Sequence, residues 1–381
     1  MLPFRPRFLL MAAVLAVSFA PTAQADVTVG VSVALSGPAA SLGVPAKNAL
    51  ALWPQEIAGE KLRIVLLDDA ADPTSAVRNA RRFVEEKADV MIGTANTPSS
   101  ISMAQVAQEV QIPQLTPAPA ELPEGKDAWT FRMAMHAAFY TEGLIDHMKR
   151  SGVKTLGFLG LSDAYGELYL QAFQKQAAAA GITVGPVERF NRGDASVSAQ
   201  VLRVSMAKPD AVLVVAVGGG AALPQKSLKE RGYAGKIYHT PASISTDFVK
   251  IAGADAEKVI VVSGPEQVAE QLPASHQGKA LAMQFVEQYE RRYGAGSRTQ
   301  FAAHIFDFGQ VLQKAVPIAL KKARPGTPEF RLALKEALET SGPVPTSKGL
   351  LHYTATDHWG HGPDARVMLT LQGGDWKLLP R

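Results

Sequence analysis

The sequence predicts an α/β protein with two lobes, each a parallel sheet flanked by helices. Apolar runs typical of strands alternate with amphipathic patterns typical of helices from residue 27 to about residue 264. These runs are apolar almost throughout, which indicates parallel strands buried on both faces. Residues 272–341 are then mostly helical in pattern, and a short β segment follows near the end of the chain. Without its first 25 residues the chain of 381 is long enough for two domains.

The elements follow in order along the chain. Strands are expected at 27–35, 62–69, 88–95, 154–161, 182–190, 210–217, 235–240 and 258–264. Among the helices between them, 75–87 is introduced by Asp72 as cap and Pro73 in the first turn, and 165–181 ends at Gly181. Further helices are expected at 280–294, 301–323 and 328–342. In the last segment, two consecutive glycines predict the turn of a hairpin within 366–379.

The first 25 residues have the pattern of a secretory signal. Arg5 and Arg7 precede an apolar run at 8–20, and the small residues of Ala23-Gln24-Ala25 form a cleavage site. A membrane anchor is the alternative, but this run is short of the roughly 20 residues that a spanning helix needs. The chain contains no cysteine, so disulfides and lipid attachment through a cysteine are excluded. We expect cleavage after Ala25 and a protein in the periplasm.

The charge balance argues against nucleic acid as a partner. The formal net charge is +4, and the predicted signal contributes two arginines and no acid to it. The mature chain therefore carries only +2, and its charges recur at helical spacing beside apolar residues, as in 78–83 and 226–232. This pattern is typical of solvated helix faces.

Candidate binding loops follow the predicted strands. In open parallel sheets, ligands bind beyond the carboxyl ends of the strands, where helix N-termini offer free N–H groups. The loops at these positions are rich in Gly, Ala, Ser, Thr and Pro, which let a ligand approach the backbone closely. They lie at 36–43, 93–100, 116–121, 161–167, 218–223 and 240–245.

Motifs for cofactors and catalysis are incomplete. Gly218 and Gly220 begin a dinucleotide-like pattern, but Leu223 replaces its third small residue and no acid ends the next strand. No phosphate loop occurs, and GVSVA at 30–34 resembles a nucleophile elbow only in part. His358 and His361, with Asp357 and Asp364 near, are the best metal candidates, yet they lie in a Gly-rich stretch without the fixed helical face of a zinc motif. We expect a structural loop there, and no cofactor or metal.

Four of these stretches together carry a family resemblance: SGPAASLG at 36–43, IGTANTPSS at 92–100, TPAPAEL at 116–122 and DAYGE at 163–167. In this order and spacing the chain resembles, from residue 26 to 381, the periplasmic solute-binding proteins of the leucine/isoleucine/valine-binding class, which have the type I fold.

The resemblance implies a monomeric two-lobed clamp that closes on a small organic acid or amino acid. The clamp then delivers this ligand to an ABC permease in the inner membrane. Three crossovers are expected near 136–140, 263–267 and 344–349. The implied N-terminal lobe comprises 26–138 and 267–345, and the C-terminal lobe comprises 139–266 and 346–381.

The resemblance also implies roles for single residues. It places Leu42 on the apolar side of the ligand, where the family often has an aromatic side chain. Thr97 matches a residue that binds the ligand carboxylate, and Ala118 and Ala120 match the next carboxylate-binding loop. Because Ala120 replaces a usual Thr or Ser, only its backbone N–H could contribute. Tyr165 matches the tyrosine that closes over the ligand from the second lobe.

Two departures from the family pattern indicate the ligand. Gly220 falls where a side chain, often aromatic, contacts the ligand, so the pocket is expected to be larger. Ala242 falls where amino-acid binders place the acid that pairs with the α-ammonium. Phe306 and His304, on a helix that would border the cleft, and His239 from the second lobe could supply a ring face and polar contacts. The alternative for these three is a purely structural role, as for many partly buried histidines.

An ammonium buried without an acid costs several kcal/mol, so a site without the acid is expected to discriminate against amino acids. The ligand expected first is a small carboxylate with an aromatic or phenyl-substituted body, and branched-chain amino acids are expected second. A sensor module with the same fold is an alternative of another class. A secreted enzyme is disfavoured, because no nucleophile, base and orienting group occur together at the strand ends.

Overall fold

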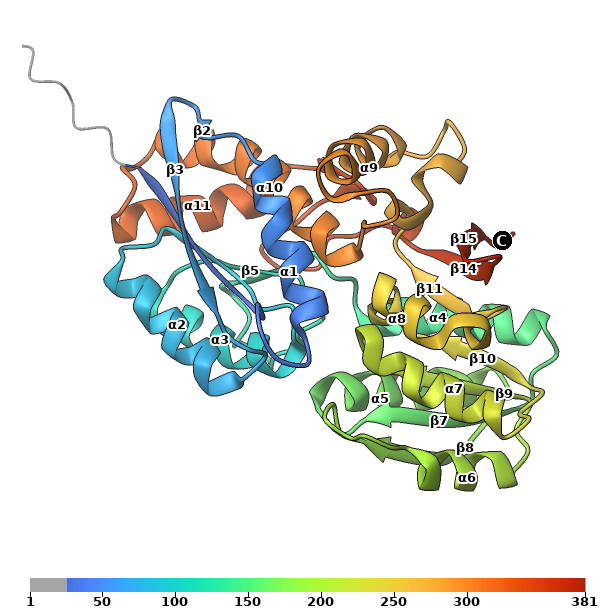
Figure 1. The fold of residues 1–381 in the computed structure, drawn as a ribbon. Helices are drawn as coiled ribbons and strands as arrows, with labels where there is room; N and C mark the ends of the chain where they lie inside the picture. Colours follow the sequence, from blue (N-terminus) through green and yellow to red (C-terminus); the bar gives the residue numbers. More distant parts are fainter. Residues whose placement is uncertain (1–25, 381) are drawn as a thin grey trace, which may run out of the picture.

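The protein folds into two α/β lobes connected by three crossovers, as predicted (Figure 1). The computed structural model describes residues 26–380. The predicted signal at 1–25, with its cleavage site after Ala25, therefore lies outside the described residues, which begin at Asp26. Within 26–380, no helix combines the length and the hydropathy needed to cross a membrane.

The first lobe is built on a six-stranded sheet with the order β2-β3-β1-β4-β5-β6. All neighbouring pairs are parallel except β2 with β3. The strands are β1 (Val27–Val33), β2 (Glu56–Ile57), β3 (Glu60–Asp68), β4 (Val90–Ile92), β5 (Gln114–Thr116) and β6 (Thr130–Arg132). The sheet is thus mostly parallel, as predicted, with one short antiparallel pair, β2 and β3, at this edge.

Helices cover this sheet on both faces. They are α1 (Ala40–Ala49), α2 (Pro73–Glu85), α3 (Thr97–Val110), α10 (Gln300–Leu320) and α11 (Pro328–Thr340). The four valines of β1 face the core shared with α1 and α10, whereas Gly30 lies under the ring of Phe83 from α2, where no Cβ would fit. Helix α9 (Lys279–Tyr293) joins this lobe, since the Tyr289 hydroxyl donates to the Pro45 carbonyl of α1.

The second lobe contains a seven-stranded sheet with the order β15-β14-β11-β10-β9-β7-β8. Its strands are β7 (Thr155–Leu161), β8 (Thr183–Phe190), β9 (Ala211–Val215), β10 (Lys236–His239), β11 (Ile260–Ser263), β14 (Val367–Gln372) and β15 (Asp375–Leu378). β14 is antiparallel to both of its neighbours, β11 and β15, and the other neighbouring pairs are parallel. β14 and β15 form the predicted hairpin, in which Gly373 and Gly374 both have positive φ, at 60° and 85°.

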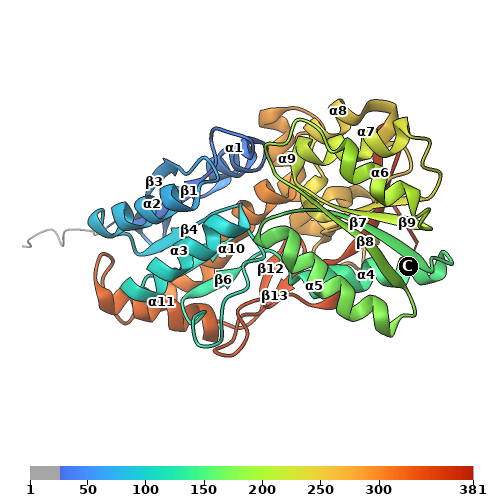
Figure 2. The ribbon, with the colours of Figure 1, turned by 90° about the horizontal axis from the view of Figure 1, so that it is seen from below.

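The helices of the second lobe form two groups, visible in Figure 2 on either side of the sheet. Helices α4 (Ala137–Arg150) and α5 (Ala164–Ala179) pack against each other. The other group is α6 (Ser198–Met206), α7 (Ala222–Glu230) and α8 (Thr246–Ala252). The two residues predicted to begin and end helices have the expected conformations. Asp72 accepts a hydrogen bond from the Ser75 N–H at the start of α2, and Gly181 after α5 has a φ of 70°.

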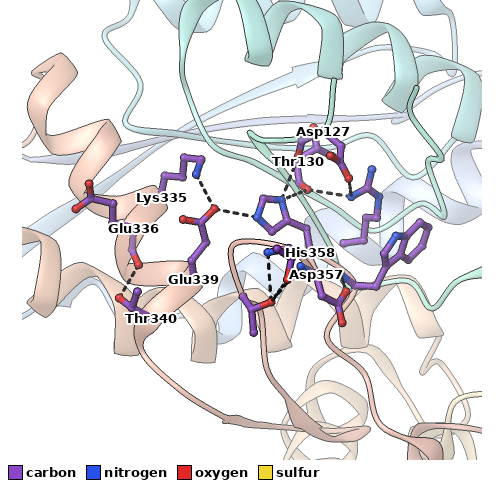
Figure 3. A network of polar contacts seen from close by, with 12 residues as sticks. Asp127, Thr130, Lys335, Glu336, Glu339, Thr340, Asp357 and His358 are labelled. Carbon is purple, nitrogen blue, oxygen red and sulfur yellow. Dashed lines mark hydrogen bonds and ion pairs between the residues drawn. The ribbon is translucent and has the colours of Figure 1, made fainter. Parts of the chain in front are cut away.

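The segment after the small hairpin of β12 (Val344–Thr346) and β13 (Gly349–Leu351) packs on the first lobe. The His358 ring stacks on Phe131 of β6 at 4.0 Å between centroids. Its Nε2 lies 3.0 Å from Glu339, and its Nδ1 lies 3.1 Å from the Asp127 carbonyl. Figure 3 shows His358 between these groups, with Lys335 on the far side of Glu339. This network holds the segment to the first lobe.

The chain reaches the second lobe only after this segment. The His361 ring contacts the Met133 carbonyl of the first lobe at 2.9 Å, whereas Arg366 lies 3.0 Å from Glu142 of α4. The third crossover in the structure therefore lies at about 362–366, later than the expected 344–349, because residues 352–361 cover β6. The first crossover joins β6 to α4, and the second follows β11.

Candidate ligand-binding cleft

A cavity of about 20 Å³ lies between the lobes, beyond the carboxyl ends of the parallel strands. The first lobe lines it with Leu42, Ala95, Thr97, Pro117, Pro119, Ala134, Gln300, Phe301 and His304. The second lobe lines it with Tyr140, Tyr165, Tyr169, Arg192, Val217, Pro241 and Ala242. The lobes touch beside it, since Gly218 lies directly against Ser41 and Leu42. The lobes are therefore in contact at this cleft, and a ligand larger than a water molecule needs them to lie further apart than in this structure.

Larger grooves occur elsewhere on the molecule. One of about 760 Å³ lies beside α4 and the last residues of the chain, lined mainly by apolar side chains such as Leu272, Val367 and Leu379. We choose the smaller cavity as the candidate site, because it lies at the strand ends of both sheets and is lined by buried polar groups without partners.

Five of the sequence-predicted residues line this cavity: Leu42, Thr97, Tyr165, Ala242 and His304. Tyr165 lies in the first turn of α5, whose N-cap Asp163 accepts hydrogen bonds from the Tyr165 and Gly166 amides. The Tyr165 hydroxyl donates to Thr240 Oγ1 at 2.9 Å, and burial raises its pKa to about 12. Tyr165 is therefore a neutral, fixed wall of the cleft.

Thr97 lies at the N-terminal end of α3. The N-cap is the preceding residue, Asn96, so Thr97 is the first helical residue and not the cap itself. Among the described residues its hydroxyl has no hydrogen-bond partner, and its side chain is buried at the cavity. A hydroxyl at the positive end of a 14-residue helix suits an anionic group.

Ala118 and Ala120 are buried but do not line the cavity. The Ala118 N–H donates to Thr116 Oγ1 at 3.1 Å, and the Ala120 N–H donates to the Ala118 carbonyl at 2.9 Å. The two walls that this loop gives to the cavity are Pro117 and Pro119, which have no N–H. In this structure neither Ala118 nor Ala120 therefore offers a free N–H to a carboxylate.

Three other predicted residues lie away from the cavity. Phe306 is buried in the core, with its ring 5.5 Å from that of Phe285. His239 contacts Gln225 Oε1 at 3.0 Å, and burial lowers its pKa to about 3, as expected of a neutral structural histidine. Gly220 lines a neighbouring cavity of about 40 Å³, which shares Arg192 and Val217 with the first.

Arg192 is a cavity residue that the sequence analysis missed. Its Nε donates to Asp163 at 2.7 Å, whereas its Nη1 is buried and has no partner among the described residues. The sequence could have indicated it, because Arg192 lies two residues after the end of β8, but the loop at this strand end was not among the candidate binding loops. Within residues 26–380, the cavity lining contains this one cation and no acid.

Tyr140 and His304 line the cavity and are completely buried. In the described chain, the Tyr140 hydroxyl has no hydrogen-bond partner, and the His304 ring has only the nearby Pro117 carbonyl, outside normal hydrogen-bond geometry. Burial raises the pKa of Tyr140 well above its usual value and lowers the pKa of His304 well below its own. The positive charge of Lys348 acts on His304 in the same direction, so both side chains are neutral.

A buried ion pair lies behind the cavity. Lys348, in the turn between β12 and β13, lies 2.9 Å from Glu266, which follows β11 at the second crossover, and both side chains are fully buried. The two atoms do not have the angles of a well-aligned hydrogen bond, so the attraction is mainly Coulombic. This pair ties the hairpin of the first lobe to a crossover strand.

Asp307 lies beside this pair and gives a pH-dependent prediction. Burial raises the pKa of Asp307 to about 7, although Lys348 and the two Ser347 donors oppose this shift. The unfolded carboxyl titrates near 3.8, so between about pH 4 and pH 7 the folded protein binds a proton that the unfolded chain lacks. Its contribution to stability is complete below pH 4 and is lost as the pH rises to 7.

The variant Asp307→Asn stays neutral at all pH values. We therefore expect its free energy of unfolding, relative to that of the native protein, to increase steadily from pH 4 to pH 7. Urea unfolding at intervals of one pH unit measures this difference. A difference that is constant over the range would contradict the assignment of a raised pKa to Asp307.

The two histidines considered for metal binding have structural contacts. His358 belongs to the network of Figure 3, and His361 contacts the Met133 carbonyl. No group of three or more potential metal ligands occurs among residues 26–380.

Fold and site together define a class of protein: a two-lobed clamp with a small cleft between the lobes, lined by apolar residues and a few buried polar groups. Residues 26–370 match the sequence profile of the periplasmic binding protein family, and the chain belongs to this family. The family consists of exported solute-binding proteins, the ligand-binding components of ABC transporters, rather than enzymes. The predicted resemblance is thereby confirmed.

Three relatives illustrate the range of similarity. Leu/Ile/Val-binding protein homolog 3 of Brucella melitensis biotype 1 is 23% identical over 350 residues, which cover 89% of this chain and 90% of that protein. The structure of an extracellular ligand-binding receptor from Rhodopseudomonas palustris is 44% identical, with a TM-score of 0.92 over 93% of this chain and 99% of that one. A solute-binding protein of an R. palustris ABC transporter, in complex with benzoate, is 21% identical, with a TM-score of 0.78 over 93% and 95%.

Proposed function

We propose that this protein captures a small aromatic carboxylate between its lobes for an ABC importer. The observation that carries the proposal is the buried Nη1 of Arg192, which has no partner in a cavity lined by no acid. A guanidinium with a free N–H is suited to a carboxylate, because charge-assisted hydrogen bonds are the strongest available in proteins. Thr97 faces the same cavity from the other lobe. Closure then places both on the ligand.

The same lining disfavours an amino acid. An α-ammonium buried in this cavity would meet Ala242, at the position where the family pattern has an acid. No Asp or Glu of the described chain lines the cavity. Burying that charge unpaired costs several kcal/mol. The aromatic walls offered by Tyr165, Tyr169 and Phe301 suit a flat ring. The benzoate complex of the R. palustris relative gives independent support for this ligand class in the fold.

The remaining parts of the proposal follow from this function. The signal is removed after Ala25, and the mature protein acts as a monomer in the periplasm. The loaded, closed clamp docks on an inner-membrane permease, which accepts the ligand as the lobes reopen.

A thermal-shift screen of the mature protein tests the proposed function. The panel contains benzoate and cinnamate, aliphatic acids of similar size, and leucine, isoleucine and valine. A ligand present at a hundred times its dissociation constant adds about 2.7 kcal/mol to native stability, which raises the unfolding midpoint visibly. We expect the aromatic acids to raise the midpoint and the amino acids to leave it unchanged. Stabilisation by leucine or valine alone would overturn the proposal in favour of a branched-chain amino acid.

A further inference from the structure

Two further polar side chains line the cavity. Tyr140, from α4, and His304, from α10, are both fully buried. The Tyr140 hydroxyl has no partner in the described chain, and the His304 ring has no well-aligned one, although the Pro117 carbonyl lies near it. A buried donor or acceptor left unsatisfied costs free energy, so such groups in a binding cavity indicate a ligand that pairs with them. An unsubstituted aromatic ring has no hydrogen-bond donor or acceptor for either side chain.

Different elements hold Arg192 and these two side chains. The Arg192 guanidinium is fixed by Asp163, the N-cap of α5, whereas Tyr140 belongs to α4 and His304 to α10. Glu266 and Arg366 act electrostatically on Tyr140, and Lys348 acts on His304. A ligand held by Arg192 is therefore expected to meet Tyr140 and His304 with another of its groups.

The chemistry of these two side chains selects a neutral group. A neutral imidazole has one donor and one acceptor nitrogen, and a phenol both donates and accepts. A hydroxyl, which also donates and accepts, matches both. A second carboxylate fits less well, since Lys348, whose charge acts on His304, is already paired with Glu266 at 2.9 Å.

We propose that the ligand is an aromatic acid with a hydroxyl on its ring, and that Tyr140 and His304 bind this hydroxyl. This proposal rests on the proposed function, and it adds two residues that determine specificity. Phe301 also lines the cavity, with its ring edge-on to that of His304 at 6.1 Å, so only a small substituent fits beside His304.

Matched pairs of acids test the proposal by isothermal titration calorimetry on the mature protein. Each pair differs only by hydroxyl against methyl, which have similar size: 3- and 4-hydroxybenzoate against 3- and 4-methylbenzoate, and 4-hydroxycinnamate against 4-methylcinnamate. We expect the better hydroxylated acid to bind roughly 10- to 100-fold more tightly than its methyl partner, because the methyl leaves buried polar groups unpaired. Equal affinities within every pair would overturn the proposal and leave the proposed function intact. If no acid of either kind binds, both proposals fall.

Two variants assign the preference to these residues. Tyr140→Phe removes only a hydroxyl without a partner, so the fold should be retained, the hydroxyl preference should shrink about tenfold, and the methyl acids should bind at least as well as before. His304→Leu should act in the same direction. Tyr233→Phe is the control, since this tyrosine donates to the Pro209 carbonyl away from the cleft, and it should leave both affinities unchanged. If both variants still bind the hydroxylated acids more tightly than the methylated ones by the native factor, other groups recognise the hydroxyl.

Discussion

Replacing Arg192 by glutamine should nearly abolish binding of aromatic carboxylates. The change keeps a hydrogen-bonding side chain but removes the charge opposite the carboxylate. Loss of one partner from a buried, hydrogen-bonded charge pair costs about 2–5 kcal/mol, which corresponds to a dissociation constant raised roughly 30- to several thousand-fold. Calorimetric titration of the native protein and of Arg192→Gln with the best acid of the panel measures this loss directly.

Two comparisons make this result specific. The carboxamide analogue of the ligand has no charge, so Arg192→Gln should weaken its binding far less than that of the acid. Arg203→Gln removes an exposed arginine that pairs with Glu188 on the surface of the same lobe, and should change affinity little. Equal losses for acid and amide would mean that Arg192 shapes the cleft without binding the carboxylate.

The fold could be predicted largely from hydrophobic patterning. Buried parallel strands such as β9, with all five residues inside, leave a continuous apolar signal, and the helices between them carry caps such as Asp72. The errors lie where pairing is set by tertiary contacts. The two residues of β2 form an antiparallel edge too short to leave a pattern, and residues 352–361 cover β6 through His358 and Trp359, contacts that no local pattern encodes.

The site could be predicted only in part, for a related reason. Loops at strand ends bring Leu42, Thr97, Tyr165 and Ala242 to one cavity, because parallel sheets place those ends together. Which groups remain free to bind is decided by hydrogen bonds inside the fold. The amides of Ala118 and Ala120 are engaged within their own loop, whereas Nη1 of Arg192 is free because Asp163 takes only its Nε.

The position of Tyr140 in the sequence does not indicate a binding residue either. It lies after a crossover, and not in a loop at the carboxyl end of a strand of its own lobe. Its importance depends on what surrounds it: a cavity on one side, and the buried pair of Lys348 and Glu266 behind. Tyr140 and His304 therefore lie where elements from the two lobes and a crossover meet. Substitution of either residue of the buried pair should mainly change the free energy of unfolding.

The second large effect is expected from Lys348→Met. Methionine has nearly the length of lysine, so the main consequence is that Glu266 stays fully buried without its cation. Breaking a buried pair in this way costs about 3–5 kcal/mol in free energy of unfolding. Urea unfolding of the ligand-free mature protein should show this as a clearly lowered midpoint. As a surface control, Lys322→Met breaks an exposed pair with Glu336 and should cost less than about 1 kcal/mol.

The double variant Lys348→Met with Glu266→Leu separates charge from packing. If desolvation of the remaining carboxylate causes the loss, removing that carboxylate as well should restore most of the stability, because a buried pair is often no more stabilising than apolar side chains of similar volume. A double variant as unstable as Lys348→Met alone would instead assign the loss to the shape of the lysine side chain between the hairpin and the crossover. Recovery of stability with the ligand affinity of the native protein would further show that the pair supports the hinge and leaves the cleft itself unchanged.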